Sequence, residues 1–159
     1  MDLWVRDAAV PGTCRRPEEV AALVVASPDP DPRIVEALPA VLAWNEWHPV
    51  LLEAHGRVAG TRALRRLAWL AEIALTIDRA GGFPGGLDRS RLASFIESVF
   101  RDKRPTDWDD LSRPQAPPLP PLWKRWRINY GATLADFEER ARRLLSLREQ
   151  SAGRGKMTR

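Results

Sequence analysis

Cysteine and histidine are scarce in this chain, and their scarcity excludes several kinds of site. Its 159 residues include one cysteine, Cys14, so no internal disulfide can form. The two histidines, His48 and His55, are seven positions apart, and Pro49 is expected to start a helix that leaves His48 outside it. Neither an HExxH motif nor a cysteine pair is present. We therefore predict no metal site and no cofactor.

Motifs for nucleophilic catalysis and for nucleotide binding are also missing. No serine lies in a Gly-x-Ser-x-Gly elbow. The stretch GGFPGG (81–86) lacks the lysine and hydroxyl residue of a phosphate-binding loop, and no strand precedes it, so it predicts a turn between helices. The few residues able to form an acid–base site are Glu72, His48, His55 and Glu53. We predict that the protein is not an enzyme, and keep a small enzyme with a Glu/His site as an alternative.

No stretch of the sequence predicts a membrane segment. The apolar run at Leu67–Ile77 is too short to cross a bilayer. The residues after Met1 include Asp2, Arg6 and Asp7, where a signal peptide would need an apolar core. A single cysteine suits a reducing compartment. We therefore expect a cytoplasmic protein that does not contact a membrane.

The segment RALRRLAWLAEIALTIDRAGGFPGG (62–86) is the most informative part of the chain. Between Leu67 and Ile77 its only charged residue is Glu72, so a helix formed here is apolar on nearly every side and must be buried. We predict this central helix from about residue 61 to 80, stopped by Gly81. Glu72 has two interpretations: it lies at a narrow exposed edge, or it is buried and needs a partner. In the second case the cation would come from Arg66, Lys124 or Arg125.

Helical periodicity and the 14 prolines predict the elements around this central helix. We expect helices over about 17–26, from 32 with a kink or restart at Pro39, over 49–56, from about 88 to 101, and up to about 149. Thr133 and Asp136 resemble a capping box before the last helix. Strand patterns are almost absent. The sequence therefore predicts an all-α domain of five or six irregularly arranged helices.

The connection between the last two predicted helices is long and irregular. Trp108 and Leu111 are expected to anchor it to the core, and the prolines at 114–121 to form a proline-rich strap. Residues 122–130 are predicted to be extended or irregular rather than a helical turn. We divide the chain into a flexible N-terminal arm (1–16), a single helical domain (17–150) and a disordered basic tail (151–159).

Tryptophan is abundant, with seven residues, and suggests a function beyond packing. The segment LWKRWRINY (122–130) combines tryptophan with arginine, and both are favoured where proteins contact each other. A phenylalanine held between glycines in GGFPGG offers another contact. We therefore predict a protein-binding surface made of Trp123, Arg125, Trp126, Arg127, Phe83 and Trp47.

A net charge of +4 and a pI near 10.0 allow a second kind of partner. Tryptophans 123 and 126 could stack unpaired bases, and the basic tail could contact phosphates. However, the arginines at 140–143 follow acidic residues at helical spacing, which is typical of a solvated helix face. A nucleic-acid-binding regulator that uses residues 122–130 and the basic tail is therefore the alternative to a protein-binding module.

Three stretches, LAWNEWHPVLLEA (42–54), RRLAWLAEIALTIDRAGGFPGG (65–86) and LWKRWRINY (122–130), resemble small bacterial helical proteins encoded beside nucleotidyltransferase-type toxins of the abortive-infection class. The resemblance covers about residues 32–145 and includes no catalytic motif, so it implies no particular site residues. It implies an antitoxin that neutralises a partner toxin enzyme by direct contact. Antitoxins often carry an N-terminal DNA-binding module, and the first 30 residues contain no recognisable one.

Overall fold

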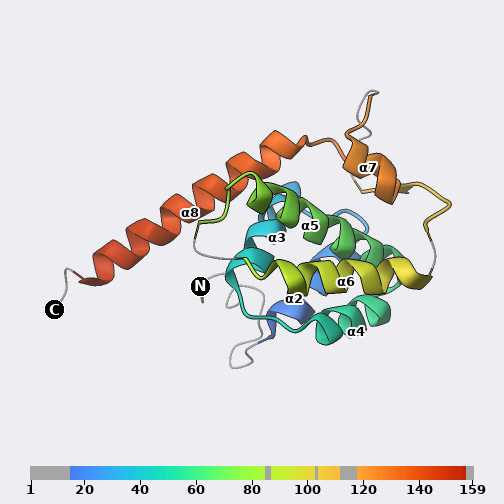
Figure 1. Cartoon of the computed structure of the whole chain (residues 1–159), viewed down its shortest axis with the longest axis horizontal. Helices are drawn as coiled ribbons and strands as arrows, with labels where there is room; N and C mark the ends of the chain where they lie inside the picture. Colours follow the sequence, from blue (N-terminus) through green and yellow to red (C-terminus); the bar gives the residue numbers. More distant parts are fainter. Residues whose placement is uncertain (1–14, 85–86, 103, 112–117, 157–159) are drawn as a thin grey trace.

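A computed structural model of the chain describes residues 15–84, 87–102, 104–111 and 118–156. This part of the chain forms seven helices and one short two-stranded sheet, which confirms the predicted all-α class (Figure 1). The predicted N-terminal arm lies, up to residue 14, outside the described residues. The elements are α2 (Pro17–Ala26), α3 (Pro32–Trp44), α4 (Pro49–Ala59), α5 (Thr61–Arg79), α6 (Arg89–Asp102), β1 (Asp109–Asp110), α7 (Pro121–Trp126), β2 (Ile128–Asn129) and α8 (Leu134–Lys156).

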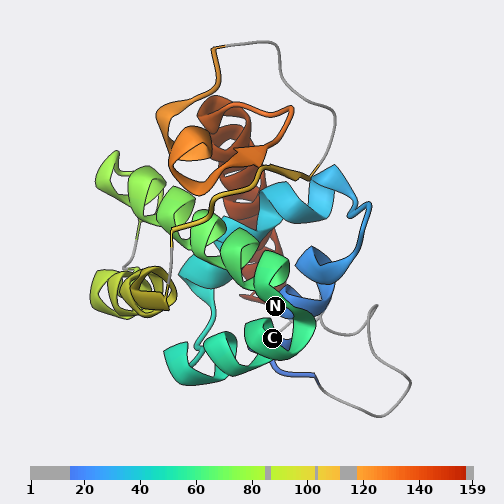
Figure 2. The same cartoon turned by 90° about the vertical axis from the view of Figure 1, so that its right-hand side faces the viewer.

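Helix α5 is the centre of the fold, as the sequence predicts. It contacts α2, α3, α4, α6, α7 and α8, and Figure 2 shows it crossing the molecule with α4 and α6 on one side and α7 on the other. Most of its side chains between Ala63 and Ile77 are buried. The helix ends at Arg79, and Gly81 follows with a φ of 81°, a left-handed conformation that favours glycine. An apolar helix therefore forms the core, and the other helices cover it.

Proline is the first residue of α2, α3, α4 and α7, where its missing amide costs no helical hydrogen bond. Asp31 caps α3, because its carboxylate accepts a hydrogen bond from the Arg33 amide at 2.8 Å. The restart considered at Pro39 does not occur, since α3 is a single helix from Pro32 to Trp44. Pro39 is buried, and its packing offsets the hydrogen bond that it cannot donate.

Helix α4 continues three residues beyond the predicted stop at Gly56. A Cβ on Gly56 would lie 2.8 Å from a side-chain carbon of Leu64, so this glycine permits close approach of α4 to α5. The turn itself is made by Gly60, whose φ is 120°. The prediction assigned a stop to a glycine that serves helix packing.

Helix α8 begins as predicted and ends later than predicted. The Thr133 amide donates to Asp136 Oδ2 at 2.6 Å and the Asp136 amide faces Thr133 Oγ1 at 3.4 Å, which confirms the capping box. The helix then continues through 149 to Lys156, so the predicted disordered tail is wrong for residues 151–156, while 157–159 lie outside the described residues. The segment contains no proline, and its glycines weaken a helix without blocking it.

The connection before α8 is more regular than expected. Residues 121–126 form α7, so the extended or irregular prediction for 122–130 is wrong for its first part. It holds for residues 128–129, which form β2 and pair in parallel with β1. Leu111 is buried as predicted, whereas Trp108 is 46% exposed and is not a core anchor. Of the proline-rich strap, residues 114–117 lie outside the described residues, and Pro121 is the first residue of α7.

None of the helices in the described part of the chain is both long and apolar enough to span a membrane.

Candidate functional site

The two tryptophans of α7 belong to the core. Trp123 is 0% exposed and Trp126 is 1% exposed. The Trp123 ring lies edge-on to Trp69 of α5 at 5.2 Å between centroids and to Phe137 of α8 at 5.9 Å. The predicted contact role of Trp123 and Trp126 is therefore corrected: both side chains close α7 over α5 and offer no surface to a partner or to a nucleic-acid base.

Glu72 is the residue that holds α7 in this position. Its Oε1 accepts a hydrogen bond from Arg125 at 2.7 Å, and its Oε2 accepts one from the indole of Trp126 at 2.5 Å. The Arg125 guanidinium also lies over the Phe100 ring, 4.8 Å from its centroid. With its side chain 16% exposed, Glu72 is partly buried, and it has the cation partner that the second interpretation requires, namely Arg125. A predicted contact residue, Arg125, thus has a structural role while remaining half exposed.

Phe83 and Trp47, the other two aromatic candidates, are 4% and 6% exposed. Phe83 lies edge-on to Trp44 with ring centroids 6.0 Å apart. The Trp47 indole donates to the Leu42 carbonyl at 2.8 Å. The turn that carries Phe83 folds back onto α3, so glycine flexibility serves burial here, and the contact prediction for both residues is corrected.

Arginines organise the connection that carries β1. Arg66 is 2% exposed and forms two hydrogen bonds with Asp109, at 2.7 and 2.8 Å, while donating to the Val25 carbonyl at 2.7 Å. Arg127, the last predicted contact residue, has a left-handed backbone with a φ of 49° and donates to the Thr106 carbonyl. Its exposed side chain therefore fixes the segment before β1.

Three of the four residues considered for acid–base chemistry have a structural partner. His48 caps α4, accepting from the Val50 amide at 3.3 Å, and its own amide donates to buried Glu18 at 2.7 Å. Glu53 pairs with Arg57 at 2.7 Å on α4, and Glu72 pairs with α7. His55 lies half-buried on α4. Among the described residues, no group of three His, Cys, Asp or Glu side chains is placed to hold a metal.

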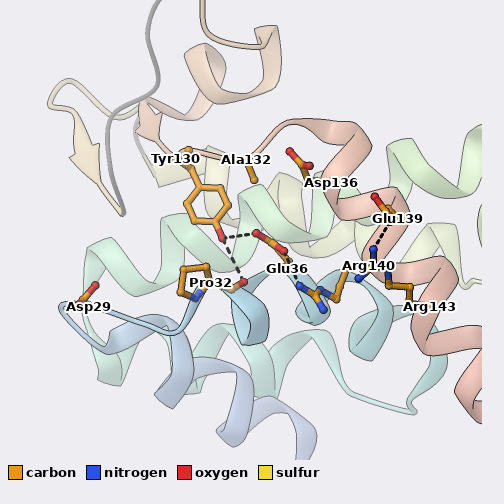
Figure 3. Close-up of a pocket in the computed structure, with 10 residues that line it drawn as sticks. Asp29, Pro32, Glu36, Tyr130, Ala132, Asp136, Glu139, Arg140 and Arg143 are labelled. Atoms are coloured by element: carbon orange, nitrogen blue, oxygen red, sulfur yellow. Dashed lines mark hydrogen bonds and ion pairs between the residues drawn. The ribbon is translucent and has the colours of Figure 1, made fainter.

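A cavity of about 620 Å³ lies where α8 crosses α3, at a place that the sequence does not mark (Figure 3). It is bounded by the loop before α3, by the segment before α8 and by the first half of α8. Its lining residues are Asp29, Pro32, Glu36, Tyr130, Gly131, Ala132, Asp136, Glu139, Arg140 and Arg143. Most of its polar groups are charged.

Glu36 lies at the centre of the polar contacts in this cavity. Its Oε1 is 3.3 Å from the Tyr130 hydroxyl and its Oε2 is 3.4 Å from an Arg140 nitrogen, as Figure 3 shows. The Tyr130 hydroxyl is also 3.3 Å from the Pro32 carbonyl. Burial, followed by the neighbouring Glu36 carboxylate, raises the pKa of Tyr130 well above its ordinary value. The phenol therefore stays protonated and can donate to either acceptor.

The sequence contains no signal for this cavity, because its residues are distant along the chain. Tyr130 is 94 positions from Glu36, and Arg140 is 104 positions from it. On α8, Arg140 and Arg143 resemble ordinary solvated arginines with acidic neighbours at helical spacing. The crossing of α8 over α3 alone places them beside Glu36.

A smaller cavity of about 350 Å³ lies further along α8. Trp44, Phe83, Pro84, Leu87 and Leu145 provide its apolar walls, and Arg148 and Glu149 lie at its edge. The Arg148 guanidinium lies 5.6 Å from the centroid of the Trp44 ring. This is the region in which the packing of α8 against the rest of the molecule ends.

The second half of α8 is largely exposed, and the Arg148 contact with Trp44 lies near its start. We call residues 146–156 the α8 extension; the side chains of 146–154 are all exposed, and Leu147 is 58% exposed. Figure 1 shows the helix continuing past the other elements toward the C-terminus. Residues 142–154 contain four arginines and one glutamate, so this part of the helix is basic.

Comparison of the chain with protein-family models, with curated proteins and with solved structures finds no match in any of the three.

Proposed function

We propose that the protein is a non-catalytic protein-binding module that contacts its partner through the α8 extension. The observation that supports this is the exposure of residues 146–154 on a helix whose first half is packed into the domain. A short helix with few tertiary contacts is marginal in water. A partner that covers one side of the extension would supply the missing packing, as in other complexes where a helix lies in a groove.

The charge of the extension favours an acidic partner. Within the extension the sequence places Arg148, Arg154 and Lys156 against the single acid Glu149. Electrostatic complementarity of this kind speeds association and selects among partners. Leu147 adds an exposed apolar side chain that a partner can bury.

A protein fits this surface better than a nucleic acid does. Base stacking needs exposed rings, and Trp123 and Trp126 are buried. The cavity at the base of α8 contains four carboxylates, which repel a phosphate backbone that follows the helix. The nucleic-acid-binding regulator therefore stays the second candidate.

The resemblance in the sequence suggests one specific form of this function. In that form the protein is an antitoxin, its partner is a nucleotidyltransferase-type toxin in the cytoplasm, and neutralisation is steric, with α8 covering the entrance to the enzyme's cleft. The aromatic rings that were expected to contact the toxin are buried, so the proposed contact surface is the α8 extension.

Co-purification with a matched pair of variants tests the proposal. Leu147→Glu combined with Arg154→Glu changes the extension, whereas Val58→Glu places a charge on a 90% exposed valine of α4. We expect the wild type and Val58→Glu to retain a defined acidic companion protein, and the double variant to lose it. Equal retention by all three, or recovery of the wild type as a lone chain, would contradict the proposal. Salt-sensitive retention of nucleic acid would favour the second candidate.

A further inference from the structure

The cavity between α3 and α8 opens to the surface and has an excess of negative charge. Its lining contains the carboxylates of Asp29, Glu36, Asp136 and Glu139 and the guanidiniums of Arg140 and Arg143. The two arginines pair with Glu36 and Glu139. Two of the four negative charges are therefore not balanced by a lining cation, and an anionic ligand is disfavoured at this place.

Glu36 is held loosely enough to accept a stronger donor. Its two contacts, at 3.3 and 3.4 Å, are long for hydrogen bonds to a charged group, which are usually about 2.7–2.9 Å. Within the described part of the chain, the Nε of Arg140 is buried without a hydrogen-bond partner, so Arg140 holds Glu36 by a single contact rather than by a two-pronged pair. The side chain of Glu36 is 16% exposed. It is therefore largely shielded from bulk water, and each of its oxygens has a single long contact.

Tyr130 gives this arrangement a rigid wall. Its ring is packed against Trp69 at 5.5 Å and against Phe137 at 5.8 Å between centroids, and the residue is 2% exposed. The hydroxyl thus has a fixed position beside Glu36 (Figure 3). Because the phenol keeps its proton, it steadies the carboxylate by donation, and its oxygen retains lone pairs that can accept from a ligand.

We propose that this cavity binds an organic cation, with the carboxylate of Glu36 holding a guanidinium or primary ammonium group and Asp29 adding negative charge at the rim. A volume of about 620 Å³ accommodates such a head group together with a short carbon chain. The same head group occurs on a free small molecule and on an arginine or lysine side chain of a protein partner. The second source rests on the proposed function, because α8 would then contribute to both contacts.

Titration of the full chain with agmatine, which carries a guanidinium and a primary amine, tests this site by calorimetry. We expect saturable binding that Glu36→Gln weakens at least about tenfold, because a charge-assisted hydrogen bond is lost. Glu46→Gln, which changes the net charge equally at an exposed position outside the cavity, is expected to leave the affinity unchanged. Butylurea, a neutral analogue, is expected not to bind.

A second cavity variant keeps the result decisive. Asp29→Asn on the exposed loop is expected to weaken agmatine about threefold without touching the core, so it serves even if Glu36→Gln lowers stability. No agmatine binding, or equal binding by the wild type and both cavity variants, would overturn the proposal.

The source of the cation follows from a competition experiment. If agmatine displaces the companion protein and Glu36→Gln weakens that complex, the cation is a side chain of the partner. If agmatine binds and the complex is unaffected, the cation is a free small molecule. Failure of the Leu147 and Arg154 variant to affect the complex would count against the proposed function alone, because it does not alter agmatine binding.

Discussion

Phe137 and Leu147 lie on the same helix, ten positions apart, in opposite surroundings. Phe137 is 0% exposed, and its ring meets Trp69, Trp123 and Tyr130 at 5.7–5.9 Å between centroids. Leu147 is 58% exposed and lies on the uncovered extension. The backbone is helical at both positions, so secondary structure does not distinguish them. Tertiary packing does, and it divides α8 into a structural half and a half that is available for binding.

The difference shows how this protein uses its apolar residues. The core around α5 contains the buried rings of Trp69, Trp123 and Phe137. The buried ion pair of Arg66 and Asp109 also lies in the interior of the domain. Of the tryptophans that the structure describes, Trp108 keeps a largely exposed ring. What the domain presents instead is charge, on the α8 extension and in the cavity at its base.

The largest expected effect is at the packed half of α8. Phe137→Ala should lower the free energy of unfolding by about 4 kcal/mol, because it removes a large ring from a closely packed cluster. Leu147→Ala is the matched control and should change it by less than about 0.5 kcal/mol. Urea unfolding followed by tryptophan fluorescence measures both. Similar values for the two variants would show that the halves of α8 do not differ as described.

The buried ion pair tests whether polar contacts in the domain matter as much as the rings do. Asp109→Ala should lower the free energy of unfolding by about 3 kcal/mol, because it leaves Arg66 buried without its counter-charge. Replacing both residues, as Arg66→Met with Asp109→Leu, should recover most of the loss. The double variant also removes the hydrogen bond from Arg66 to α2. If it is no more stable than Asp109→Ala, that hydrogen bond contributes as much to stability as the ion pair does.

A smaller effect is expected at the start of α8. Thr133→Ala removes the hydroxyl from the capping box and should lower the free energy of unfolding by about 1 kcal/mol. Thr133→Ser retains the hydroxyl and should remain near the wild type. Chemical denaturation of both variants makes the comparison, and an equal loss in the serine variant would argue against capping as the cause.

The smallest effect on global stability is expected in the extension. Gly153 has open space around its Cα, so Gly153→Ala should strengthen the local helix by up to about 1 kcal/mol without altering the unfolding midpoint. Carbon-13 chemical shifts of residues 150–156 measure local helicity. An increase in the unfolding midpoint would show that the extension unfolds together with the domain.

Much of the fold was accessible from the sequence because the signals are local. The apolar run of α5, the prolines that begin helices, the Asp31 cap and the box of Thr133 and Asp136 act within a few residues, and the structure contains each of them. The glycine at 56 misled the prediction because its role is contact with Leu64 in another helix. The end of α8 was misplaced because serine and glycine weaken a helix without stopping it, while alanine favours one.

The candidate site was far less accessible. Tryptophan and arginine together are typical of interfaces, and also of a core whose edge is closed by an ion pair. In residues 122–130 the tryptophans are buried in the core and Arg125 forms an ion pair with Glu72. The cavity depends on Glu36, Tyr130 and Arg140, which are ordinary in their own segments.

By itself, the sequence determined the all-α class, the central position of α5 and most helix starts, since hydrophobic periodicity and capping are properties of neighbouring residues. Only the tertiary structure decided which aromatic rings are covered, that Glu72 joins Arg125, and that α8 crosses α3 beside Glu36 before leaving the domain. Those outcomes depend on which distant segments pack together in the core. The residue type alone does not show whether an aromatic or charged side chain is buried or exposed.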